Sequence, residues 1–221
     1  VARLGARKIA TCEVPVLFEA PIAASLIGHF ASAVSGSNLY RKSSFLLNSI
    51  GQHIFADDIQ IRESPHLHKG LASSPFDDDG VATVERHVVE NGVVQGYFLG
   101  SYSARKLGMR TTGNAGGTHN LIMYNAVPMN FSAVLKKMDT GLLVTELMGH
   151  GVNSVTGDYS RGASGFWVER GEIVYPVEEI TIAGNLREMF RGIVAIGNDV
   201  MMRGSRQCGS VLIDRMTVAG D

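Results

Sequence analysis

The chain has 221 residues, 45% hydrophobic and 19% charged, a composition typical of a globular protein that buries a substantial core. Lys and Arg number 20 against 21 Asp and Glu, so net charge attracts neither nucleic acid nor a membrane surface, and we expect neither as a direct partner. No apolar run approaches the roughly 18 residues of a membrane span. Two distant cysteines, Cys12 and Cys208, favour reduced thiols in a cytoplasm, with a single long-range disulfide left open.

In chain order, apolar periodicity and turn residues predict mostly short strands and a few helices. Asn91-Gly92 and Arg170-Gly171 are predicted hairpin turns, and Asn185 with Glu188 predicts a capping box. The predicted elements are a helix at 21–34, a strand at 58–64, a hairpin at 86–99, a helix at 101–107, strands at 119–126 and 140–148, a hairpin at 165–177, a strand at 178–184, a helix opened by Asn185, and a strand at 209–220. We therefore predict one strand-rich α+β domain with a largely antiparallel sheet.

Three polar segments are weak functional candidates. "TTGNAGGT" at 111–118 lacks the Gly-Lys-Ser/Thr ending of a phosphate loop, which favours a flexible loop. The consecutive carboxylates of "PFDDDGVAT" lack the alternation of a calcium loop and favour a solvated turn. "HLHK" places His66 and His68 on one side of a strand, but with no third ligand in view we expect a surface pair.

A stronger candidate is the glycine-flanked "MGHGVNSVTGDYSRGAS". His150, Asp158 and Arg161 supply polar groups that could line a substrate groove. An ordinary surface loop remains the alternative.

His29 poses a separate question, because a lone histidine on the apolar helix "IAASLIGHFASAV" is usually a core residue. The segments "TTGNAGG", "GDYSRGASGFWVERGEI", "PVEEITIAGNL", "AIGND" and "QCGSVLIDRMTVAG" resemble the carboxy-terminal half of the TldD/PmbA family, in its PmbA (TldE) branch. The resemblance runs nearly from end to end. It implies that residues 1–221 are the C-terminal domain of a longer chain, as the start at Val1 without a signal-peptide pattern also suggests.

The resemblance further implies a cytoplasmic two-subunit metalloprotease whose TldD partner carries His-Glu-x-x-x-His and a later cysteine as zinc ligands. In this sequence Ala24 and Ser25 stand where the first histidine and the glutamate would be, and His29 where the second histidine would be. Cys208 is a relic of the cysteine ligand in this interpretation. Alanine binds no metal and a serine hydroxyl cannot replace a carboxylate base, so we expect no catalytic residue and no zinc in this chain.

The resulting hypothesis is a non-catalytic subunit that contacts peptide substrate and a zinc-bearing TldD-like partner. One alternative is a divergent metallopeptidase using His29, Cys208 and a further ligand such as His53 or His150. Another is a regulatory protein that binds gyrase, as an older family label implies. Because many short strands must cover their edges, we also expect an oligomer, with a homodimer as the default when no partner is present.

Overall fold

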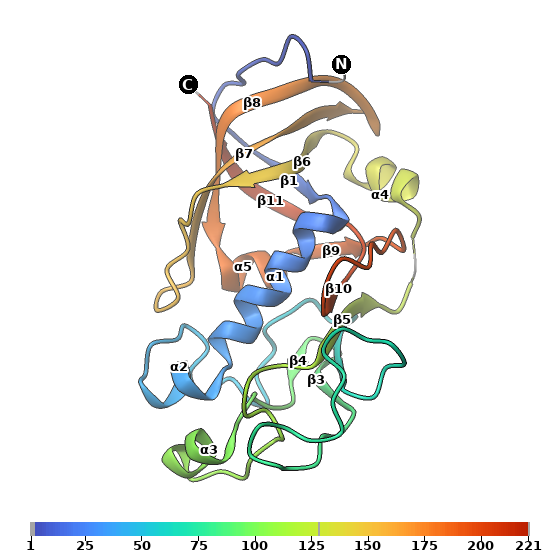
Figure 1. Ribbon diagram of the computed structural model, residues 1–221. Coiled ribbons are helices and arrows are strands. Elements are labelled where there is room, and N and C mark those ends of the chain that lie inside the picture. The colour runs from blue at the N-terminus through green and yellow to red at the C-terminus, as the bar shows by residue number, and fades with distance from the viewer. Residues whose placement is uncertain (1–2, 128, 221) are drawn as a thin grey trace.

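The computed structural model describes residues 3–127 and 129–220, and its strands form two sheets connected by the helix α1 (Ala20–Ala33). In Figure 1, α1 runs from the larger sheet toward the smaller one. Within the described ranges, no helix combines the length and the apolar character needed to cross a membrane.

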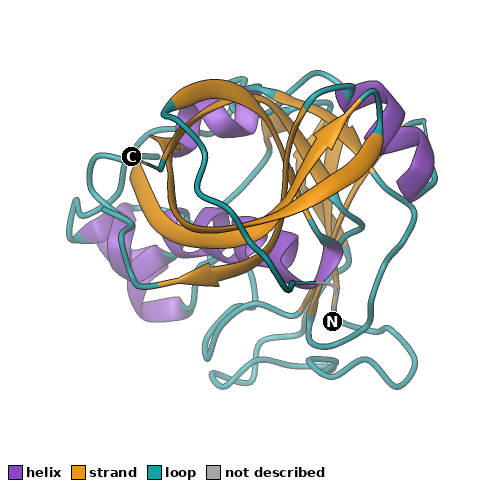
Figure 2. Cartoon of the chain, turned by 90° about the horizontal axis from the view of Figure 1, so that it is seen from above, coloured by secondary structure: helices purple, strands orange, loops and turns teal. Residues whose placement is uncertain are grey.

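The larger sheet has six strands in the order β1-β6-β7-β8-β11-β9, and β1 also pairs with β11. This extra pairing closes five of the strands into a small barrel, visible as a ring of strands in Figure 2. Among the described strands of this sheet, β1 and β6 are the only neighbours that pair in parallel, and the other neighbours pair antiparallel. The strands are β1 (Cys12–Phe18), β6 (Gly141–Met148), β7 (Asp158–Glu169), β8 (Glu172–Asn185), β9 (Ile193–Ile196) and β11 (Val211–Ala219).

The smaller sheet has five strands in the order β10-β5-β2-β3-β4, with a single parallel pair between β10 and β5. Its strands are β2 (Ile59–Ser64), β3 (Arg86–Glu90), β4 (Val93–Val94), β5 (Asn120–Asn125) and β10 (Arg206–Gln207). The predicted strand-rich α+β class with largely antiparallel pairing is confirmed.

One hydrophobic core joins the barrel, α1 and the smaller sheet. Along β1, Val16 and Phe18 enter this core, whereas Leu17 points to the other side and packs against α4 (Phe131–Met138) in a second, smaller core. This is the alternation of a strand buried on both faces. Phe30 of α1 and Ile61 of β2 lie in the same main core, so α1 is fixed between the two sheets.

Both predicted hairpin turns are confirmed, because Asn91, Gly92, Arg170 and Gly171 have φ angles of 47°, 75°, 54° and 76°. Positive φ at both central residues is the type I′ geometry that matches strand twist. The predicted strand at 178–184 is instead the second half of the long strand β8, which bends at a register shift around Glu179.

The three predicted helices are present as α1, α3 (Ser101–Leu107) and α5 (Leu186–Arg191). Asn185 caps α5 by accepting a hydrogen bond from Arg187 N at 3.0 Å. Five elements were not predicted from the sequence: α2 (Gly36–Tyr40), α4, β1, β9 and β10.

Candidate functional site

A pocket of about 310 Å³ lies beside the first two turns of α1. Pro21 is compatible with the first helical turn, where backbone N–H groups have no helical partner. Leu26 and other apolar residues of α1 are buried, while Ala24 and Ser25 remain half-buried and line the pocket. The opposite wall is the segment 201–206, which includes Met201, Arg203 and Arg206.

Arg206, the first residue of β10, lies directly against α1 at Gly28. A Cβ atom at Gly28 would stand 2.8 Å from Arg206 Nη1, so only glycine leaves room for the guanidinium in this position. In the described part of the chain, neither Arg203 nor Arg206 has a side-chain hydrogen bond or an ion pair. Both arginines are exposed, and the pocket therefore carries two positive charges that pair with no acidic side chain of the described residues.

His29 is half-buried one turn after Ser25, and its ring packs edge-on against Tyr159 of β7 at 6.0 Å between centroids. Burial lowers the pKa of His29, and the nearby charges of Arg161 and Arg206 lower it further. Among the described residues, His29 Nε2 and Arg161 Nε are buried without hydrogen-bond partners. His29 is thus a neutral imidazole facing positive charge at pH 7.

The residues at this place do not fit a zinc ion. Ala24 offers no ligand atom, and Ser25 Oγ donates a hydrogen bond to Ile22 O at 2.6 Å. Cys208 is only 2% exposed, and burial, with a smaller effect of Asp199, raises the pKa of its thiol to about 12. Cysteine binds zinc as the thiolate, and histidine binds it as the neutral imidazole. Residues 3–127 and 129–220 contain no group of three His, Cys, Asp or Glu side chains able to hold a metal.

The structure brings only two of the three groove candidates together. His150 and Asp158 line an open pocket of about 550 Å³ at the start of β7. Asp158 accepts a hydrogen bond from Thr156 Oγ1 at 2.6 Å. Arg161 is three residues further along the strand and is turned to the other face, where its charge acts on His29 and Tyr159.

The sequence candidates His53, His66 and His68 lie in exposed loops. His53 lies 3.1 Å from Asp57 Oδ1 before β2. The residues of "HLHK" follow β2 in a turn, not in a strand, and both His66 and His68 are exposed. The expected surface histidines are therefore found, although their expected strand geometry is wrong.

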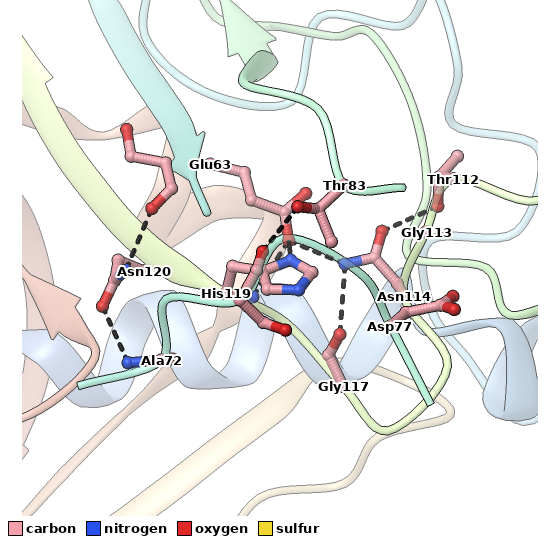
Figure 3. Close-up of polar contacts among 12 residues, drawn as sticks. Glu63, Ala72, Asp77, Thr83, Thr112, Gly113, Asn114, Gly117, His119 and Asn120 are labelled. Carbon is pink, nitrogen blue, oxygen red and sulfur yellow. Dashed lines mark hydrogen bonds and ion pairs between the residues drawn. The ribbon is translucent and has the colours of Figure 1, made fainter. Parts of the chain in front are cut away.

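Sequence reasoning missed a buried carboxylate, Glu63, which is 1% exposed near the end of β2 (Figure 3). Its Oε2 accepts from Arg86 Nε at 2.9 Å. Its Oε1 accepts from Asn114 Nδ2 at 2.7 Å, and from the backbone N and ring Nδ1 of His119 at 3.0 and 3.1 Å. A signal was present, because Glu63 continues the inward-facing series of Ile59 and Ile61 at spacing two.

This network anchors the glycine-rich segment 111–118, which was expected to be a flexible loop. Asn114 is 6% exposed, and its Oδ1 accepts from Thr112 Oγ1 at 2.7 Å and from Arg86 Nη2 at 3.0 Å. Asp77 Oδ2 accepts from Ala115 N at 2.9 Å. Asp77 is 5% exposed, so the expected solvated turn is wrong for this carboxylate, although Asp78 and Asp79 are exposed.

The profile of the PmbA/TldA metallopeptidase C-terminal domain matches residues 11–220. The chain is 54% identical over 220 residues to metalloprotease PmbA of Escherichia coli O157:H7, and 53% identical over 221 residues to the PmbA homologue of Haemophilus influenzae. Each match covers 100% of this chain and 49% of the relative. The chain thus spans about half the length of these curated relatives.

Solved structures share the fold. A proposed modulator of DNA gyrase from Bacteroides thetaiotaomicron superposes with a TM-score of 0.93 at 32% identity, covering 100% of this chain and 50% of that one. A second, from Thermotoga maritima, gives 0.91 at 37% identity, with 99% and 52% covered. TldE from Thermococcus kodakarensis gives 0.85 at 24% identity, with 99% and 53% covered, a similarity of fold alone.

Proposed function

The chain belongs to the PmbA/TldD metallopeptidase family, as a C-terminal domain of its PmbA branch, and from this premise we propose that it is part of a non-catalytic protease subunit. The subunit pairs with a TldD-like partner that carries the zinc. Together they act in the cytoplasm on peptides and on small or unfolded proteins.

The observation that carries the proposal is the side-chain chemistry along α1. A metallopeptidase needs a ligand and a general base on this helix, and Ala24 and Ser25 can supply neither. The remaining histidine, His29, faces the charges of Arg161 and Arg206, which repel a divalent cation instead of attracting one.

A subunit without a base can still raise the rate by holding the substrate in a productive orientation. The open pocket lined by His150 and Asp158 is one surface on which we propose that an extended peptide or the partner rests. The alternative metallopeptidase centre built from His29 and Cys208 is disfavoured, because Cys208 is only 2% exposed and, within residues 3–127 and 129–220, no group of three possible ligands includes this pair.

The test is co-purification of the full-length protein with its TldD-like partner, followed by zinc analysis and a peptidase assay on each protein and on the pair. We expect zinc in the partner only and cleavage by the pair only. One tightly bound zinc per copy of this protein alone, with peptidase activity, would support the metallopeptidase alternative instead. Retention of gyrase, but not of the TldD-like partner, on this protein would favour the gyrase-binding alternative.

A further inference from the structure

We infer that the pocket between α1 and the segment 201–206 binds the terminal carboxylate of a peptide, with Arg203 and Arg206 as its counter-charges. The inference deepens the proposed function and rests on it, because it assigns one end of the peptide to a defined place on this chain.

The positive charges that line the pocket favour a negatively charged ligand. Two arginines line a space of about 310 Å³, and in the described residues neither guanidinium is engaged by a carboxylate or a carbonyl. Guanidinium groups present paired N–H donors that match the two oxygens of a carboxylate. The nearest acidic residue in sequence, Glu19, precedes α1 and does not line the pocket.

The position of Arg206 is built into the helix. Gly28 provides the space in which this guanidinium lies against α1, although glycine is less favourable than alanine within a helix. The first turn of α1 adds the positive end of a 14-residue helix at Ala20 and Pro21 on the same wall. The Arg206 guanidinium and the N-terminus of α1 both make the electrostatic potential in this pocket more positive.

The apolar part of the lining indicates a peptide end. Ala20, Pro21 and Ala24 form one side, and the thioether of Met201, 44% exposed, stands on the other. A pocket of this size admits about two residues, and methionine adapts to different apolar side chains. A C-terminal carboxylate attached to an apolar last residue satisfies both the charged and the apolar groups.

The experiment measures binding of an N-fluoresceinyl peptide, Ala-Ala-Ala-Leu, to the full-length protein without its partner, by fluorescence anisotropy. The free acid is compared with the C-terminal amide, and with an amide that carries an internal aspartate. We expect the free acid to bind about tenfold more tightly than either amide, because only it supplies a terminal carboxylate. Equally tight binding by the aspartate peptide would overturn the assignment to a chain end.

Variants locate the binding. Arg203→Gln and Arg206→Gln should each remove most of the preference for the free acid, whereas Arg105→Gln, on the exposed side of α3, should leave it unchanged. Gly28→Ala keeps every charge but displaces the Arg206 guanidinium, and it should also weaken binding of the free acid. Thermal unfolding confirms that each variant is folded.

Two further outcomes would contradict the inference: equal binding of acid and amide, or no measurable binding of either. An acid preference that survives both arginine substitutions would place the carboxylate elsewhere and would also overturn it. These results leave the subunit role intact. That role fails independently if the zinc-bearing partner cleaves peptides equally well without this protein.

Discussion

Glu63 is the residue whose loss we expect to be most damaging, because one buried carboxylate satisfies donors from Arg86, Asn114 and His119. Glu63→Gln keeps the shape but leaves the Arg86 charge without its partner. Breaking a buried ion pair from one side costs about 3 kcal/mol, so the free energy of unfolding in urea should fall by about that amount.

The matched control is Glu85→Gln. Glu85 pairs with Arg62 at 3.4 Å, but their side chains are 51% and 41% exposed, and such pairs contribute about 0–1 kcal/mol. A similar loss of stability in both variants would show that the burial of Glu63 is not the cause of the loss in Glu63→Gln.

His29 should make stability depend on pH. Its pKa in the folded protein is lowered by burial and by Arg161 and Arg206, so below pH 6.5 the unfolded chain takes up a proton that the folded chain resists. The free energy of unfolding therefore decreases as the pH falls through this range. In His29→Gln this contribution is absent. The wild-type-minus-variant difference, measured by urea unfolding from pH 5 to 8, should be flat above about pH 7 and decline below it.

At the scale of elements, the barrel depends on close contact between β6 and β7. A Cβ atom at Gly165 would meet the carbonyl oxygen of Leu143 well inside van der Waals distance. Because backbone cannot yield as a side-chain end can, Gly165→Ala should cost more than about 2 kcal/mol of unfolding free energy. Gly162→Ala is the control on the same strand, since its nearest neighbour is Met148 Cβ at 3.4 Å. Equal melting temperatures for the two variants would contradict this account.

The elements predicted correctly are those with local signals. Asn91-Gly92 favours a type I′ turn, and Asn185 supplies the side-chain acceptor at the start of α5. β9 and β10 are short and are defined by pairing with distant strands, which no local pattern encodes. The same holds for the anchored glycine-rich segment, whose order derives from Glu63, far away in the sequence.

The candidate site was predictable only in part. Ala24, Ser25 and His29 could be placed on one helix from the sequence. The opposing arginines could not, because Arg206 reaches Gly28 from the other end of the chain. Strand alternation, by contrast, was available and would have separated Asp158 from Arg161, which are an odd number of residues apart.

For the whole molecule, we expect peptide cleavage by the assembled pair to require this protein but not its His29 or Cys208. His29→Ala and Cys208→Ser should leave turnover within about threefold of wild type, because neither residue is proposed to touch the reacting atoms. Size-exclusion chromatography confirms assembly of each variant before the assay. Loss of turnover in a properly assembled, zinc-loaded pair with His29→Ala would give this histidine a catalytic role.

The pairing of β1 with β11 also determines when the domain can fold during synthesis. Cys12 lies opposite Val218, so β1 must wait for a strand that is synthesised much later. The ribosome holds the most recently made part of a growing chain, and β1 therefore remains without this neighbour until β11 has emerged. Such distant pairing slows folding. Until β1 and β11 have paired, the apolar residues Val16 to Phe18 of β1 form a surface that a chaperone can protect from aggregation.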